Sequence, residues 1–338
     1  MGEGWGEGGC NFTPLPSPLP QGARGLRRIR VASLDLLKQL FSIASVIFGV
    51  LLLTFLLIHL VPGDPVEVML GESASVADRD ALRADLGLNQ PLITQFGSYL
   101  GRLSHGDFGQ SIHTKTPIID MLKTRYPATL KLAVISLLIG LLIGIPLGIY
   151  AALKAGHWQD FVVTIVSVRL SAMPAFWLGP MLMLVFAVWL GWLPVSGMES
   201  GGSIILPAMT LGFGLSAILT RMTRTSLLEV LSDDYIRTAR AKGLSEKTVI
   251  IRHALRAALL PIITIVGLQM GSLLAGTVIT ETVFGWEGIG RLLVESIEKR
   301  DYPVTQACVL VVALSYVLVN LATDVLYRFA DPRVKFGG

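Results

Sequence analysis

Six stretches of this chain are free of charge and long enough for a helix to cross the hydrocarbon core of a membrane, which takes about 20 apolar residues. We expect transmembrane helices over about residues 39–63, 132–153, 161–192, 203–220, 257–280 and 302–323. The third is expected to include one charge, Arg169, and to be kinked by Pro174 and Pro180. The sequence therefore predicts an all-α polytopic membrane protein.

The composition supports this class of protein. Of 338 residues, 52% are hydrophobic and only 15% are charged, whereas average chains carry about 25% charged residues. The net charge of +4 does not indicate nucleic-acid binding, because the basic residues collect beside the apolar stretches. The two cysteines, Cys10 and Cys308, cannot form a disulfide framework or a metal site.

Residues 1–33 form a leader that is rich in glycine and proline and then basic. Such a segment cannot bury enough apolar surface to fold, so we expect it to be disordered. It has no apolar core of the kind found in a signal peptide. Our hypothesis is that this extension lies outside the functional protein.

Lysine and arginine are placed so that both termini are expected on the cytoplasmic side. The segments on that side are strongly basic, while the last outer loop carries more acidic than basic residues, and the positive-inside rule favours this orientation. One large outer loop, residues 64–129, is then extracytoplasmic. We expect it to form a small folded cap that includes a helix over Asp78–Leu86, ended by Gly87.

A polar cytoplasmic loop, residues 221–256, separates the fourth and fifth spans. Ser232 is a suitable N-cap residue, and the acidic residues after it favour a helix start. A short helix is expected to continue to Lys242, with Gly243 in the left-handed conformation that ends it. Ser245 is expected to cap a second helix. From the pattern alone, this loop could equally be a solvated basic helix at the membrane surface.

The same loop resembles the cytoplasmic coupling loop of ABC-importer permeases. That family carries E-A-A-x-x-x-G, and this chain has Arg237-Thr238-Ala239 followed by Gly243. The arginine departs from the general consensus. It fits the branch for dipeptides, oligopeptides and glutathione, whose form D-Y-x-R-T-A-R-A-K-G-L…R-H-A-L-R-x-A-L-L-P is similar to Asp234–Pro261 nearly residue for residue.

The resemblance extends over about residues 34–336, the expected permease transmembrane domain. Other segments similar to the family are Gly106-Asp107-Phe108-Gly109 in the outer loop, Glu281–Arg291 after the fifth span and Arg300–Pro303 before the sixth. Glu287 stands where the family often has proline.

The resemblance implies a transport subunit of the bacterial inner membrane. Its implied partners are a second, homologous permease subunit, two cytoplasmic ATPase subunits, an extracytoplasmic substrate-binding protein and a peptide substrate. The implied ATPase-coupling residues are Asp234, Tyr235, Arg237, Thr238, Ala239, Arg240, Ala241, Lys242, Gly243 and Leu244. No catalytic residue, cofactor or metal ligand is expected. The chain has no phosphate-binding loop, so ATP hydrolysis is expected on the separate subunits.

Two other classes remain as alternatives. A secondary transporter or channel usually carries ionisable groups near mid-membrane, which these spans nearly lack. An intramembrane enzyme would need a paired nucleophile and base within them. The substrate also stays open among dipeptides, oligopeptides, glutathione and nickel complexes.

Several single residues have two interpretations. Arg169 is expected to reach the interface or pair locally rather than to act in transport. Glu281 could line an outer vestibule or only cap the fifth span. Gly140, Gly144 and Gly148 present a small-residue face that predicts close packing against a neighbouring helix.

Overall fold

The computed structural model describes residues 41–56, 66, 75–85 and 88–330. The described residues from 46 onward belong to one compact unit. The described part is helical and contains no strand, only an isolated bridge between Gln110 and Pro117. The all-α prediction is confirmed there. The leader, Cys10, Gly87 and the end of the first predicted span lie outside the described residues.

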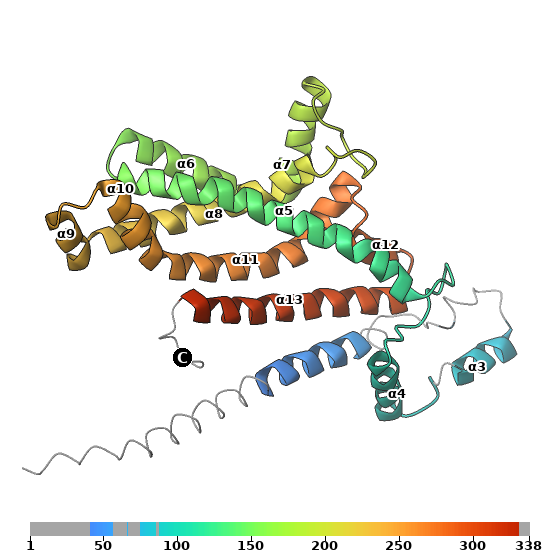
Figure 1. The fold of residues 1–338 in the computed structure, drawn as a ribbon. Helices are drawn as coiled ribbons and strands as arrows, with labels where there is room; N and C mark the ends of the chain where they lie inside the picture. The colour runs from blue at the N-terminus through green and yellow to red at the C-terminus, as the bar shows by residue number, and fades with distance from the viewer. Residues whose placement is uncertain (1–40, 57–65, 67–74, 86–87, 331–338) are drawn as a thin grey trace, which may run out of the picture. The chain divides into compact units, whose positions relative to one another are not determined.

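Four long helices run between the two ends of the unit (Figure 1): α5 (Ile118–Leu153), α8 (Ile205–Leu231), α11 (Leu255–Phe284) and α13 (Tyr302–Ala330). Each is long and apolar enough to cross a membrane. The described part of the first predicted span, Phe41–Leu56, is shorter than that. The described residues therefore support four membrane spans, or five if the bent helix pair of the next paragraph counts as one span. They do not account for all six predicted spans.

The third predicted span is broken rather than kinked. It consists of α6 (Trp158–Ala172), α7 (Ala175–Leu182) and the π-helix η1 (Met183–Trp189), and its two parts are bent by 106°. Met173 is extended, with ψ 119°, because a residue before proline is disfavoured in the helical region. The break thus falls at Pro174, whereas Pro180 stays inside α7.

Two helices are longer than the charge-free windows. α5 begins at Ile118, inside the predicted outer loop 64–129, and α8 continues to Leu231, through the first part of the predicted loop 221–256. Charge-free windows mark the depth of the hydrocarbon core, whereas backbone hydrogen bonding within a helix continues into the polar region. Arg221 and Arg224 therefore lie on a helix.

The glycine face of α5 packs closely on α8. A Cβ at Gly140 would lie 2.6 Å from Leu215, one at Gly144 would lie 2.8 Å from the Ser216 carbonyl oxygen, and one at Gly148 would lie 2.6 Å from the Thr220 carbonyl oxygen. The predicted close packing is confirmed, and the neighbour is a helix of the same chain. Figure 1 shows the two helices side by side.

The predicted outer loop contributes α3 (Val76–Asp85) and α4 (Leu92–Ser104). The predicted helix Asp78–Leu86 corresponds to α3. An aromatic cluster packs α4 on the helix Phe41–Leu56: Phe96 lies 5.2 Å from Phe55 between ring centroids, and Phe55 lies 5.9 Å from Tyr99. The same helix, Phe41–Leu56, also contacts the start of α13, because Gln306 of α13 donates to the carbonyl of Thr54. α4 and the start of α13 therefore pack on the same helix.

Glu281 is fully buried near the end of α11. Its carboxylate accepts hydrogen bonds from the Thr129 hydroxyl, at 2.7 Å, and from the Arg291 N–H, at 3.1 Å. The Arg291 N–H belongs to the first turn of α12 (Ile289–Glu298), where a carboxylate is favoured by the unpaired N–H groups. Glu281 therefore joins α5, α11 and α12, and it does not line an open vestibule.

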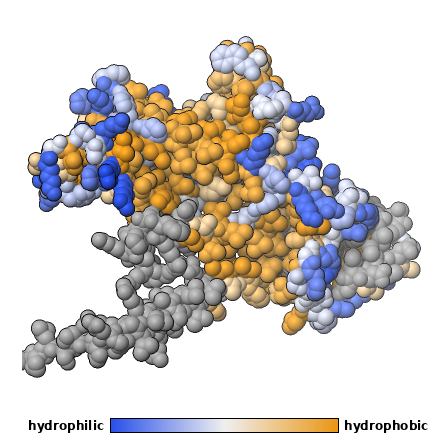
Figure 2. Space-filling view, viewed as in Figure 1, coloured by the Kyte–Doolittle hydropathy of each residue, from blue (hydrophilic) through white to orange (hydrophobic). Residues whose placement is uncertain are grey.

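The surface is hydrophobic in the middle and polar at both ends. Figure 2 shows apolar side chains over the central part of the long helices and hydrophilic side chains around α9 and α10 at one end and around α12 at the other. Exposed apolar side chains include Leu142 and Phe161. This distribution is what a lipid-embedded bundle requires.

Candidate functional site

The polar segment after α8 folds as a short helix, α9 (Asp234–Ala241), followed by α10 (Glu246–Thr248) and the π-helix η2 (Val249–Ala254), which leads directly into α11. It occupies one end of the long helices (Figure 1). The predicted helix–glycine–helix arrangement is therefore confirmed.

The start of α9 differs from the prediction by one residue. Ser232 ends α8, and its hydroxyl donates to the Glu229 carbonyl at 2.7 Å. The N-cap residue is Asp233, which is extended with ψ 148°. The predicted cap at Ser232 was wrong because α8 is longer than the sequence indicated and uses this serine at its own end.

The end of α9 matches the prediction. Gly243 has φ +78°, the left-handed conformation that glycine adopts without steric cost. The Gly243 N–H donates to the Arg240 carbonyl at 2.9 Å, and the Leu244 N–H donates to the Ala239 carbonyl at 3.4 Å. This pair of bonds is a Schellman motif, which reverses the chain sharply toward α10.

One face of α9 is buried within the chain's own core. Ile236 is 0% exposed and Ala239 is 8% exposed. Both belong to a cluster with Ala152 at the end of α5, Leu227 near the end of α8, and Val249 of η2. The spacing of three residues places both side chains on one side of the helix. α9 is therefore packed against three other elements and is not a free surface helix.

The opposite face is exposed and basic. Tyr235 is 44% exposed, Leu244 is 40% exposed, and the basic side chains are exposed as well. Arg240 donates to both oxygens of Glu246, at 2.6 and 3.2 Å, across the Gly243 turn. The Glu246 carboxylate raises the pKa of Arg240 above its ordinary value. The guanidinium is charged at any physiological pH.

The remaining predicted residues are all exposed. The Arg237 side chain is 73% exposed, and its guanidinium forms a long ion pair, at 3.5 Å, with the Asp234 carboxylate. Thr238 is exposed, and its hydroxyl donates to the Asp234 carbonyl. Ala241 and Lys242 are also exposed. Of the ten predicted coupling residues, only Ala239 is buried, so its contact is with the bundle itself.

An ion pair fixes α8 next to this segment. Arg224 donates to both carboxylate oxygens of Asp160 at the start of α6, at 2.6 and 2.8 Å. Asp160 is 6% exposed and also accepts the Gly156 N–H. A bidentate, charge-assisted pair of this kind holds two helices in a defined relation. α6 and α8 are thereby connected at the end of the bundle where α9 lies.

The sequence reasoning did not assign a role to Ile236, Asp160 or Arg224. The apolar pair Ile236 and Ala239, three residues apart in a polar helix, was a usable signal for the buried face. No sequence signal indicated the pair Asp160–Arg224, because its members are 64 residues apart. Arg169, in the last turn of α6, is exposed and forms no ion pair within the described residues.

The surface offers no metal site within the described part of the chain, where no group of three potential ligands occurs. What it offers is a small, exposed basic face with the aromatic side chain of Tyr235 on it. Such a surface suits binding to another protein rather than chemistry on a small molecule.

Comparison with known proteins agrees with this arrangement. The chain is 42% identical over 300 residues to the glutathione transport system permease protein GsiC of Escherichia coli strain K12, covering 89% of this chain and 98% of that protein. The protein of the same name from Shigella dysenteriae serotype 1 gives the same values. The fold resembles the MetNI methionine ABC transporter in inward-facing conformations, with a TM-score of 0.54 at 18% identity over 62% of this chain and 96% of that one.

Family descriptions match almost the whole of the expected transmembrane domain. The N-terminal component of binding-protein-dependent transport system membrane proteins matches residues 34–133. The description "binding-protein-dependent transport system inner membrane component" matches residues 144–336. The resemblance to ABC-importer permeases is confirmed, and the chain belongs to the family of binding-protein-dependent transport system inner membrane components.

Proposed function

We propose that this chain is one permease subunit of an ABC importer for short peptides, including glutathione-like ones, and that the exposed face of α9 is the surface on which a cytoplasmic ATPase subunit docks. The substrate class is supported by the 42% identity to permeases of glutathione transport systems. A second permease subunit would complete the translocation pathway, and an extracytoplasmic binding protein would deliver the peptide.

The two-faced structure of α9 carries the docking proposal. Its buried side chains, Ile236 and Ala239, fix it to the ends of α5 and α8. Its exposed side chains, among them Tyr235, Arg237 and Lys242, remain available to a partner. When ATP binding brings the ATPase subunits together, a docked α9 moves with its ATPase. Because α9 is packed on the long helices, they move with it. This movement opens the translocation pathway to one side of the membrane and then to the other.

In the proposed topology both termini and α9 face the cytoplasm of a bacterial cell, in its inner membrane. The basic character of α9 and of the residues around it supports this orientation. ATP binding and hydrolysis take place on the partner subunits.

A charge reversal tests the docking surface. Arg237→Glu removes no buried contact, because Arg237 is 73% exposed. We expect the variant subunit to insert normally, while the amount of co-purified ATPase and the rate of ATP-dependent peptide uptake fall by roughly tenfold. The matched control is Lys123→Glu, at a basic side chain 72% exposed near the start of α5. Normal uptake and ATPase binding by Arg237→Glu would refute the docking role.

Ile236→Ala tests separately whether α9 transmits its movement to the long helices. It leaves every exposed side chain of α9 in place but removes the side chain that anchors the helix, at a cost of about 2–5 kcal/mol for a fully buried isoleucine. We expect ATPase binding and ATP hydrolysis to persist while peptide uptake is lost. Loss of ATPase binding in proportion to uptake would contradict the division of α9 into an anchoring and a docking face.

A further inference from the structure

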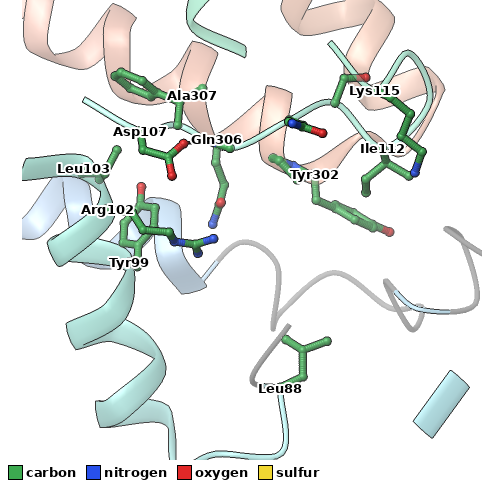
Figure 3. A pocket seen from close by; sticks show the side chains of 15 residues that line it. Leu88, Tyr99, Arg102, Leu103, Asp107, Ile112, Lys115, Tyr302, Gln306 and Ala307 are labelled. Atoms are coloured by element: carbon green, nitrogen blue, oxygen red, sulfur yellow. Dashed lines mark hydrogen bonds between the residues drawn. The ribbon is translucent and has the colours of Figure 1, made fainter. Parts of the chain in front are cut away.

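At the end of the bundle away from α9, a cavity of about 340 Å³ lies between α4, the loop 105–117 and the start of α13. Figure 3 shows the side chains that line it. Its volume is at the lower end of the range of about 300–1,000 Å³ typical of small-molecule sites. The cavity is far too small for a folded domain and suits a short, extended ligand.

The wall of the cavity is held by buried hydrogen bonds. The carboxylate of Asp301, which is 4% exposed, accepts from the Ser111 hydroxyl and from the Ile112 N–H, so that the loop is fixed to the start of α13. Gln306 donates to the Thr54 carbonyl from the other side. Because these groups satisfy one another, the wall is a formed surface rather than a gap between loops.

Three charged side chains stand around the cavity: Arg102 from α4, and Asp107 and Lys115 from the loop. None of them forms an ion pair with any described residue. One Asp107 oxygen accepts the Gly109 N–H at 2.8 Å, and the other has no partner in the described part of the chain. Among the described lining residues, the rim thus carries two cations and one carboxylate, while the Asp301 carboxylate is buried in the wall.

Tyr302 belongs to the wall of the cavity. The residue is 8% exposed, and its hydroxyl is buried without a hydrogen-bond partner in the described part of the chain. Because the hydroxyl is not accessible from the cavity, a ligand there does not contact it. A buried hydroxyl without a partner is costly, so this group does not stabilise the wall.

We propose that this cavity is a binding site for a short peptide that carries one more carboxylate than ammonium groups; its ligand class rests on the proposed function. Arg102 and Lys115 bind carboxylates of the peptide, and Asp107 binds its terminal ammonium group. The two carboxylates and one ammonium group of such a peptide match the two cations and one carboxylate of the rim one to one. In the proposed topology the cavity faces the side from which peptide arrives.

The test uses the assembled transporter in lipid nanodiscs without its extracytoplasmic binding protein. Binding of radiolabelled Ala-Ala-Glu is compared with that of Ala-Ala-Gln, which lacks one carboxylate. We expect Arg102→Gln and Lys115→Gln each to raise the Kd for Ala-Ala-Glu roughly tenfold, because each removes a charge-assisted hydrogen bond. Lys123→Gln, outside the cavity, is the matched control and should leave the Kd unchanged.

Two further variants distinguish recognition from structure. Asp107→Asn should weaken binding of Ala-Ala-Glu but not of its N-acetylated form, which has no ammonium group. Tyr302→Phe should leave peptide binding unchanged and thermal stability unchanged or higher, because it removes only a buried, unpaired hydroxyl of the wall. Weaker peptide binding by this variant at unchanged stability would contradict the assignment of the hydroxyl to the wall.

Two results would overturn the proposal as a whole. One is equal peptide affinity in all variants. The other is unchanged peptide affinity together with lost binding of the extracytoplasmic protein, which would make the cavity a protein docking surface. Either result leaves the proposed function standing if the unsubstituted transporter still takes up peptide with ATP. Failure of that uptake itself would refute the proposed function instead.

Discussion

The close approach of α5 and α8 makes a quantitative prediction at Gly148. An added Cβ would lie 2.6 Å from the Thr220 carbonyl oxygen and 2.6 Å from the Thr223 Cβ, against an ordinary contact of 3.4 Å or more. Neither obstacle is the end of a flexible side chain, so the two helices must separate by roughly 0.8 Å at this point. Overpacking of this kind costs about 1–3 kcal/mol. We therefore expect Gly148→Ala to destabilise the subunit by that amount.

Gly214→Ala is the matched control. Gly214 lies on α8, and a Cβ there meets nothing within 4 Å because the glycine borders a cavity of about 220 Å³. The same methyl group is therefore added to a helix without a collision. Since alanine favours the helix over glycine by up to about 1 kcal/mol in soluble hosts, this variant should be neutral or slightly more stable.

The assay is thermal unfolding of the purified transporter in mild detergent, followed by the loss of intact complex in size-exclusion chromatography. Gly148→Ala should unfold at a clearly lower temperature than the unsubstituted protein, and Gly214→Ala should not. Peptide uptake should also fall in Gly148→Ala, because α8 continues directly to α9. Equal unfolding temperatures for the two variants would refute the reasoning from close packing.

Two other predictions concern the end of the bundle where α9 lies. Gly243 needs a positive φ, so Gly243→Val should impair peptide uptake strongly, whereas Gly243→Asn should retain most of it, because asparagine tolerates the left-handed region and valine does not; equal activity of the two variants would contradict a conformational role. Asp160→Asn should lower the free energy of unfolding by about 2 kcal/mol, because its charge-assisted bonds to Arg224 are lost. Thermal unfolding measures this loss, and an unchanged midpoint would show that the ion pair contributes nothing.

The sequence predicted those features that depend on local chemistry. Gly243 ends α9 because only glycine adopts its φ without cost, and this holds whatever surrounds it. Pro174 interrupts the third span because proline restricts the residue before it. The size of the bend, 106°, could not be predicted, since it depends on how α7 packs on other helices.

Features that depend on distant contacts were not predictable. Ser232 is as suitable for capping α9 as Asp233, and the choice follows from where α8 ends. The motif alone could not show that Ala239 faces the bundle, because burial is decided by the ends of α5 and α8. The bonds of Glu281 required knowing that Thr129 and α12 meet beside it.

The contacts of α8 suggest how movement of α9 would be divided along the bundle. α8 has 27 residues and thus spans about 40 Å. Near the α9 end it is tied to α6 by Asp160 and Arg224, so α6 should follow α9. α7 packs instead with Phe284 at the far end of α11, where a Cβ on Gly179 would meet that ring at 3.0 Å. The break at Pro174 therefore separates a half-span attached to the α9 end from one attached to the opposite end. We expect relative movement of the two ends to be taken up at that break.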